Sequence, residues 1–294
     1  MPELPEVQTI VSDLNRKIKG DVIVDFWSDW AKAIKNLSLD KFKKEIKNRE
    51  ILEARRTGKN IFIDLSGGKT LYIHLKMTGH LLVKTKNYKL KTKNYFDDRV
   101  NQYIHHIWKL QTKNYKLKTN YDKTLEFSDL RKFGKIVLGN TEEINNLKEI
   151  KSLGIDAMSP EFTFLKFSAI LNQRKNRKIR DILMDQGLIA GIGNIYLSEI
   201  LFNAGILPVR VAENIKLAER KKLLNSVHKI LSKAIKLRGT SDSDYRDTTG
   251  APGNFQKVLK VYRRAGKECP NCGTIIKRLK MGQRSAFFCS KCQK

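Results

Sequence analysis

The first six residues, MPELPE, place a proline and two carboxylates together at the start of the chain. If Met1 is removed, Pro2 becomes a free secondary amine with the acid Glu3 beside it. An α-amino group titrates at about pH 7.7 to 8.0, so a useful fraction of it is unprotonated at neutral pH, unlike a lysine. The pair therefore suits covalent catalysis assisted by a general acid and base. Glu6 is equally consistent with a catalytic and with a purely structural role.

The four cysteines form a second candidate site. Cys269, Cys272, Cys289 and Cys292 all fall in the last 26 residues, with the spacing C-x2-C-x16-C-x2-C. This spacing is typical of a zinc ribbon, in which two tight turns each present two thiolates to one tetrahedral ion. Two disulfides in a secreted tail are the alternative, which the lack of a signal peptide disfavours. Four thiolates leave no open coordination position, so we expect one structural Zn²⁺ that holds a basic hairpin against phosphate.

The composition favours a polyanionic partner. The 294 residues suffice for two domains, and 58 Lys and Arg against 30 Asp and Glu give a net charge of +28. Charge alone does not choose between DNA, RNA and an anionic membrane. No apolar run reaches the roughly 18 residues that span a bilayer, and the N-terminus lacks a basic-then-apolar signal pattern. We therefore expect a cytoplasmic, nucleoid-associated monomer that binds no membrane.

Hydrophobic periodicity changes once along the chain. Residues 2–17 resemble a helix, and period-two or short apolar runs then predict an all-β body up to about residue 150. The predicted strands lie within 22–27, 60–65, 70–83, 105–111 and 124–138. Beyond residue 160 the periodicity is helical, which predicts a second, helical domain followed by the zinc ribbon.

A lysine-rich segment interrupts the β-type pattern. TKNYKLKTKNY at 85–95 recurs as TKNYKLKTNY at 112–121, which indicates a local duplication. A solvated surface insertion explains it. The sharper hypothesis is that its lysines add nonspecific phosphate contacts, which the salt dependence of DNA binding would test. These lysines are Lys86, Lys89, Lys91, Lys113, Lys116 and Lys118.

Gly191 and Gly193 bracket Ile192 just before a predicted helix that begins near Asn194. Backbone N–H groups at a helix N-terminus bind phosphate. A lone GxG is weak, because a tight corner between two helices has the same pattern. With the basic ribbon it indicates a DNA-binding helical domain.

Seven motifs occur in order from residue 2 to residue 293: MPELPEV, GKNIFIDL, HLKMTG, DLRKFG, DQGLIAGIGNIY, GTSDSDYRD and CPNCG…QRSAFFCSKCQ. Together they resemble the formamidopyrimidine-DNA glycosylase family, bacterial enzymes that excise oxidised purines from damaged double-stranded DNA. The resemblance implies that Pro2 attacks the sugar C1′ and displaces the base. It implies that Glu3 serves as general acid and base, and that Lys59 reaches the active-site phosphates. β- and δ-elimination would then nick the strand.

The resemblance also implies DNA contacts. His74, Lys132, Asn194 and Arg284 match positions that hold the backbone, although His74 also suits a satisfied core histidine. A wedge that fills the base stack after a base is flipped out is matched by Met77, Arg131 and Phe133, of which the apolar two would otherwise be read as core. The loop that closes over the everted purine is matched by Thr240, Ser241, Asp242, Ser243, Asp244 and Tyr245. A disordered linker is the alternative for this loop.

The implied fold is α+β and multidomain: a β-sandwich with a first helix, a helix-two-turn-helix domain and a zinc ribbon. The expected β-sandwich domain is 2–150, with an insertion at 84–121, and the expected helix-two-turn-helix domain is 151–238. The capping loop and connector are expected at 239–260, and the zinc ribbon at 261–294. The chain departs from the family pattern at Arg263, where a glycine usually follows the tyrosine. The insertion is also longer than the usual connection there.

Two other functions are compatible with parts of the sequence. An endonuclease VIII-like glycosylase shares the nucleophile but prefers oxidised pyrimidines; PELPE rather than PEGPE, and the 239–256 loop, favour the purine enzyme. A noncatalytic zinc-ribbon DNA-binding protein explains the charge and the cysteines. It gives no reason for Pro2, Glu3 and Lys59 to occur together.

Overall fold

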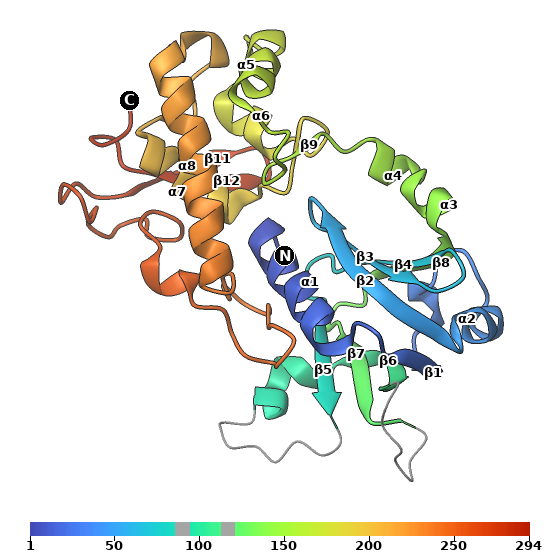
Figure 1. Cartoon of the computed structure of the whole chain (residues 1–294). Coiled ribbons are helices and arrows are strands. Elements are labelled where there is room, and N and C mark those ends of the chain that lie inside the picture. The colour runs from blue at the N-terminus through green and yellow to red at the C-terminus, as the bar shows by residue number, and fades with distance from the viewer. Residues whose placement is uncertain (86–94, 113–120) are drawn as a thin grey trace. The chain divides into compact units, whose positions relative to one another are not determined.

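The computed structural model describes residues 1–85, 95–112 and 121–294 (Figure 1). The six lysines of the repeated insertion lie outside the described residues. The chain forms two compact units, Met1–Lys151 with Leu237–Asn254, and Ser152–Lys236 with Phe255–Lys294. The segment after the long helix of the second unit thus returns to complete the first.

The first unit begins with α1 (Leu4–Ile18), close to the predicted helix at 2–17. Glu3 and Glu6 form a capping box at its start, which satisfies backbone N–H groups that have no partner within the helix. Pro5 lies in the first turn, where a missing N–H is tolerated. Val7, Ile10 and Leu14 recur on one face and are fully buried in the core of the unit.

Eight antiparallel strands follow in the spatial order β5-β7-β6-β1-β2-β3-β4-β8. β1 and β2 pair over only two residue pairs, so the sheet consists of two four-stranded halves joined at this short contact. Both halves and α1 contribute to one hydrophobic core, which gives the predicted β-sandwich. The strands are β1 (Val22–Ser28), β2 (Arg49–Thr57), β3 (Asn60–Leu65), β4 (Lys69–His74), β5 (His80–Thr85), β6 (Ile104–Gln111), β7 (Lys123–Ser128) and β8 (Lys135–Asn140).

The first unit also contains short helical segments, which the prediction of an all-β body did not include. α2 (Leu39–Ile46) starts at Ser38, whose side chain caps Lys41 N, and buries Phe42 and Ile46 one turn apart. Its eight residues are too few to produce a strong helical pattern in the sequence. The other segments are η1 (Ala31–Ala33), η2 (Tyr95–Asp97), η3 (Arg99–Gln102), α3 (Thr141–Asn145) and α4 (Lys148–Lys151).

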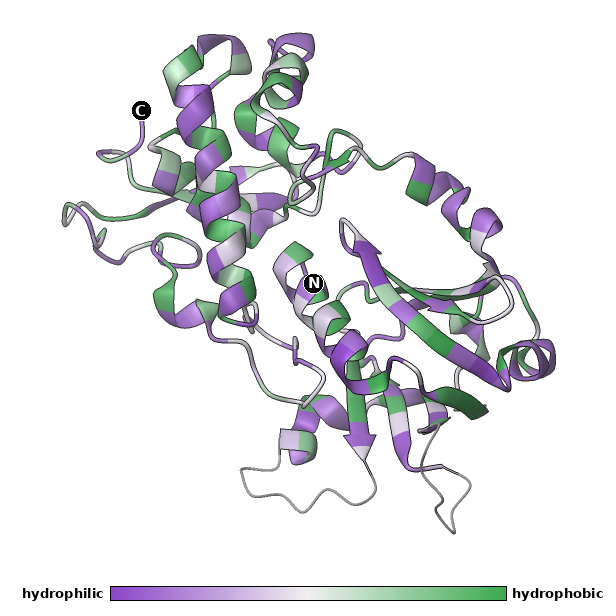
Figure 2. Cartoon of the chain, viewed as in Figure 1, coloured by the Kyte–Doolittle hydropathy of each residue, from purple (hydrophilic) through white to green (hydrophobic). Residues whose placement is uncertain are grey.

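The second unit is helical, as predicted, and carries a two-stranded ribbon. Nearly every residue of α7 (Asn194–Ala204) is buried, whereas α8 (Leu217–Lys236) is amphipathic, with hydrophobic and hydrophilic residues interspersed along it (Figure 2). Its other elements are β9 (Ile155–Asp156), α5 (Phe164–Gln173), α6 (Ile179–Met184), β10 (Ile189–Ala190), η4 (Ala212–Asn214), η5 (Phe255–Val258), β11 (Lys277–Met281) and β12 (Arg284–Phe288).

His106 of β6 makes the stability of the first unit dependent on pH. It is 2% exposed, lies among Phe26, Trp108 and Phe127, and pairs through Nδ1 with Ser28 Oγ at 2.9 Å. Burial lowers the pKa of His106 to about 4. In the unfolded chain His106 is protonated below about pH 6.5, whereas in the folded chain it stays neutral down to about pH 4. The free energy of unfolding therefore falls as the pH drops from about 6.5 to about 4.

We predict that replacing His106 with Phe reduces this acid sensitivity. The free energy of unfolding of the wild type should fall by up to about 3 kcal/mol more than that of His106→Phe over the same range. Urea unfolding of both proteins at pH 7.0, 5.5 and 4.5 measures the difference. Parallel pH profiles would show that His106 does not titrate as stated.

Candidate active site and nucleic-acid interface

The N-terminal end of α1 brings together the predicted nucleophile and its acid. Pro2 and Glu3 are both buried directly before the helix. The backbone N–H of Glu3 donates to Glu6 Oε2 at 2.7 Å, and Thr240 N donates to Glu6 Oε1 at 2.7 Å. Both oxygens of Glu6 therefore accept hydrogen bonds from backbone N–H groups, which favours the structural role for this carboxylate.

Lys59 lies in the two-residue turn between β2 and β3, after Gly58, whose φ of 58° favours glycine. The Lys59 side chain is 7% exposed, which is unusual for a solvated strand lysine. Its charge is one of those that lower the pKa of His74, so the two predicted DNA contacts share one electrostatic environment.

His74 ends β4 and is partly buried, so it is not a core histidine. Burial lowers its pKa to about 4, assisted by the charges of Lys76, Lys59 and Lys135. Its Nδ1 accepts a hydrogen bond from Lys76 N at 2.9 Å. The neutral ring therefore carries its proton on Nε2, which is a donor suited to a phosphate oxygen.

The three predicted wedge residues occupy two neighbouring loops, 75–79 and 129–134. Met77 is 43% and Phe133 54% exposed, which excludes core positions for both, and the Arg131 guanidinium lies 4.8 Å from the centre of the Phe133 ring. Thr78 joins the loops, because its Oγ1 donates to Asp129 Oδ1 at 2.5 Å and accepts from Arg131 N at 3.1 Å. Lys132 is exposed on the same tip. Exposed apolar groups on a fixed base can enter a base stack.

The 239–254 loop is anchored along its length, unlike a disordered linker. Tyr245 packs in the core, and Ser241 Oγ donates to Tyr245 O at 2.6 Å and accepts from Gly253 N at 2.9 Å. Arg238 pairs with the buried carboxylates of Asp13 and Asp247. Thr240 is buried, Ser243 is exposed, and Ser241, Asp242 and Asp244 lie between these extremes. No local pattern predicts the contact between Arg238 and Asp13, which lie 225 positions apart.

In the second unit, the start of α7 lies against the ribbon. Asn194 Nδ2 donates to Ser285 O of β12 at 3.0 Å, and its Oδ1 accepts from Arg180 at 3.3 Å. A cavity of about 550 Å³ opens beside this contact. Three arginines and no carboxylate are among its lining residues, which are Asn194, Tyr262, Arg263, Ala265, Arg278, Arg284, Ser285 and Phe287. Such a lining fits an anion, and it brings the predicted contacts Asn194 and Arg284 together.

Arg263, the departure from the family pattern, adopts a φ of 54°. This left-handed backbone suits glycine and is strained for arginine. The Arg263 guanidinium also adds to the cavity lining.

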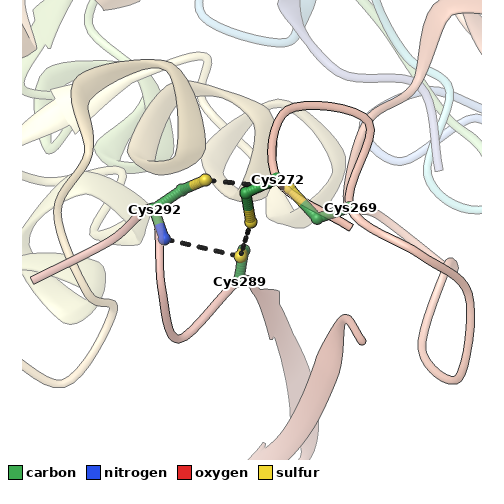
Figure 3. Close-up of side chains that lie close together, drawn as sticks. All are labelled: Cys269, Cys272, Cys289 and Cys292. Atoms are coloured by element: carbon green, nitrogen blue, oxygen red, sulfur yellow. Dashed lines mark hydrogen bonds between the residues drawn. The ribbon is translucent and has the colours of Figure 1, made fainter. Parts of the chain in front are cut away.

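The four cysteines converge as the spacing predicts (Figure 3). Their sulfur atoms all lie within 4.8 Å of one another, with Cys269–Cys292 at 3.8 Å and Cys272–Cys289 at 3.5 Å. A tetrahedral zinc ion with Zn–S bonds of about 2.3 Å separates its sulfurs by about 3.8 Å, whereas a disulfide is about 2.05 Å long. Cys292 N donates to Cys289 Sγ at 3.4 Å, which supports a thiolate there. The donor set fits one structural Zn²⁺.

Three family models cover most of the chain. They are described as Formamidopyrimidine-DNA glycosylase N-terminal domain (residues 1–136), Formamidopyrimidine-DNA glycosylase H2TH domain (residues 153–245) and Zinc finger found in FPG and IleRS (residues 266–294). Together with the sandwich, the helical unit and the thiolate site, they define the class of the protein, a zinc-finger DNA glycosylase of base excision repair.

Relatives and solved structures match over the full length. Formamidopyrimidine-DNA glycosylases of Pelotomaculum thermopropionicum and Carboxydothermus hydrogenoformans are 37% and 36% identical and are covered to 99% and 100%, with 100% of this chain matched in each case. The Lactococcus lactis Fpg in complex with an abasic site containing DNA is 29% identical, with a TM-score of 0.83 and 100% of both chains covered. The chain belongs to the formamidopyrimidine-DNA glycosylase family. Across residues 1–85, 95–112 and 121–294, no helix combines the length and the apolar character needed to cross a membrane.

Removal of zinc should weaken DNA binding without unfolding the first unit. The three tryptophans, Trp27, Trp30 and Trp108, all belong to that unit, so their fluorescence reports its unfolding alone. We predict that chelation weakens binding to duplex DNA at least about tenfold, because the ribbon that positions Arg284 loses its ion.

Thermal unfolding followed by tryptophan fluorescence should be unchanged by the chelator, and added Zn²⁺ should restore binding. Full DNA affinity in metal-free protein would show that the ribbon does not hold the DNA.

Proposed function

We propose that the chain is a bifunctional DNA glycosylase and AP lyase that excises oxidised purines from damaged double-stranded DNA, with the N-terminal amine of Pro2 as nucleophile. The observation that carries this proposal is the buried Pro2–Glu3 pair at the start of α1 in a member of this family. A mutant of the related Lactococcus lactis protein was solved with Fapy-dG containing DNA, which supports formamidopyrimidines as substrates. We propose 8-oxoguanine as a further substrate of the same class.

The proposed reaction uses Pro2 and Glu3 in sequence. After loss of Met1, the Pro2 nitrogen attacks the sugar C1′ of the damaged nucleotide, and the bond from C1′ to the base breaks. Glu3 protonates the deoxyribose ring oxygen, which opens the sugar and leaves an iminium between Pro2 and C1′. Glu3 then assists removal of a C2′ proton, and β- and δ-elimination release the two flanking phosphates. Burial of both groups limits competing reactions with water.

Other residues hold the DNA and the flipped nucleotide in this proposal. Lys59 lies near the reacting sugar phosphates, while Met77, Arg131 and Phe133 fill the gap in the stack. The residues Thr240 to Tyr245 close over the everted purine. The phosphate backbone is bound by His74, Lys132, Asn194 and Arg284.

The division of labour follows the boundaries expected from the sequence. Residues 2–150 carry catalysis, 151–238 and 261–294 hold the DNA, and 239–260 supply the capping loop and the connector. We propose that one copy of the chain acts at each lesion, as a monomer. We place it in the cytoplasm of a bacterium, on the nucleoid, as its bacterial relatives suggest.

A second substrate class has a specific observation behind it. The Lactococcus lactis protein was also solved with an oxidised pyrimidine containing DNA, at 29% identity and a TM-score of 0.82. Oxidised pyrimidines are therefore the next substrates to assay. A noncatalytic binder is not favoured, because the family match extends over the unit that carries Pro2 and Glu3.

Replacing the nucleophile should abolish excision and spare recognition. We predict that Pro2→Gly lowers the single-turnover rate of 8-oxoguanine release by at least about 10²-fold, since the secondary amine is lost. Affinity for the same duplex, measured by fluorescence anisotropy, should change by less than about threefold. Glu3→Gln should likewise bind and fail to turn over.

Pro5→Ala is the matched control, because it removes a proline from the same end of α1 without touching the amine. It should retain the wild-type rate. Wild-type excision by Pro2→Gly would refute the assignment of the nucleophile.

A further inference from the structure

A continuous set of buried polar contacts connects the two wedge loops with the 239–254 loop. Thr78, which joins the wedge loops, has its carbonyl oxygen 3.3 Å from Nδ1 of the His80 ring. His80 Nε2 lies 2.8 Å from Asn101 Oδ1. Asn101 Nδ2 in turn donates to Gly250 O at 3.1 Å. His80 is 1% and Asn101 0% exposed, so these groups depend on one another for hydrogen bonds.

The orientation of Asn101 follows from its partners. Its Nδ2 faces two carbonyl oxygens, Tyr95 O at 2.7 Å and Gly250 O at 3.1 Å, which can only accept. The amide oxygen must therefore face His80, whose proton lies on Nε2. The 3.3 Å contact from Nδ1 to Thr78 is then a close approach that becomes a hydrogen bond only if the ring is protonated. Burial lowers the pKa of His80, which keeps the ring neutral.

The 239–254 loop, which is the proposed capping loop, has a glycine at the point where Asn101 approaches it. Gly250 has a φ of 80°, and a Cβ at this position would lie 2.7 Å from Asn101 Nδ2. Glycine is thus required both by the backbone conformation and by the approach of Asn101. Gly250 N also donates to Asp247 O at 2.9 Å, which links the contact to the ion pair between Asp247 and Arg238.

An ion pair also joins residues 95–102 to the 239–254 loop. The Arg246 guanidinium donates from Nε and Nη2 to Asp98 Oδ2, at 3.0 and 2.9 Å. Asp98 and Asn101 both belong to residues 95–102, which follow the first copy of the lysine-rich repeat from its last residue onward. The described part of the insertion therefore touches the capping loop at two places.

We propose that residues 95–102 are a brace for the capping loop, in which Asn101 and Asp98 are positioning residues that hold the loop ready to capture an everted base. This rests on the proposed function of the 239–254 loop. Asp98 and Asn101 bind Arg246 and Gly250 of the loop, so the brace should govern base capture and leave the chemistry at an abasic sugar unaffected. It also gives the inserted segment a role beyond binding phosphate.

The test compares two reactions of the same full-length, zinc-loaded protein. Single-turnover base release is measured on a duplex with one 8-oxoguanine opposite cytosine, and strand cleavage on a duplex with a pre-formed abasic site. We expect Asp98→Ala and Asn101→Ala to slow base release about tenfold and to change abasic-site cleavage by less than twofold. The Tm of each variant is measured alongside, and Asp98→Ala, at a partly exposed position, decides the matter if Asn101→Ala does not fold.

Asp25→Ala is the matched control, since Asp25 forms an ion pair with Lys109 at 2.7 Å in the same unit but far along the chain from the loop. It should leave both rates unchanged. Equal losses in both reactions, or no loss in either, would overturn the brace. If the wild type releases no 8-oxoguanine but does release an oxidised pyrimidine, the proposed substrate fails, and the variants are compared on that pyrimidine instead.

Discussion

The Glu6 carboxylate is the contact on which the catalytic end of the first unit depends. One oxygen accepts from Glu3 N and the other from Thr240 N, so a single side chain fixes both the residue after the proposed nucleophile and the start of the proposed capping loop. Gly239, with a φ of 81°, is adapted to it, because a Cβ there would lie 2.7 Å from Glu6 Oε1. The residue that follows Pro2 is therefore tied, through Glu6, to a loop more than 230 residues away along the chain. A chain terminus usually frays, and this anchoring supports the proposal that the terminal amine serves as a positioned nucleophile.

The two units treat positive charge differently. In the first, burial lowers the pKa of His74, and the charges of Lys76, Lys59 and Lys135 lower it further, so the ring stays neutral. A neutral donor at this position can bind a phosphate oxygen without adding a further positive charge to the lysines beside it. In the second, Arg263, Arg278 and Arg284 line a common cavity beside the ribbon, which concentrates positive charge there.

Local patterns in the sequence predicted much of the structure. The pattern of residues 2–17 predicted the first helix, and the cysteine spacing predicted the convergence of four sulfurs. Met77 and Phe133 would be taken for core residues without the resemblance to a known family, because exposure is set by where a strand ends and not by residue type.

Contacts between distant segments could not be predicted in this way. Asp13 with Arg238, and Asn101 with Gly250, join positions 225 and 149 residues apart, and no local periodicity encodes such a pairing. The short helix α2 was missed for a different reason: eight residues provide barely two turns of pattern. Residues that position a loop are for this reason harder to find from sequence than residues that carry out chemistry.

The central claim is that the terminal amine of Pro2 forms a covalent bond with the sugar. The most direct measurement is sodium borohydride trapping of the zinc-loaded protein on a duplex with one 8-oxoguanine opposite cytosine, followed by mass mapping of the crosslinked peptide. We expect a reduced adduct on the N-terminal peptide, at Pro2 and with Met1 absent. An adduct on a lysine, or no adduct with any oxidised base, would contradict it.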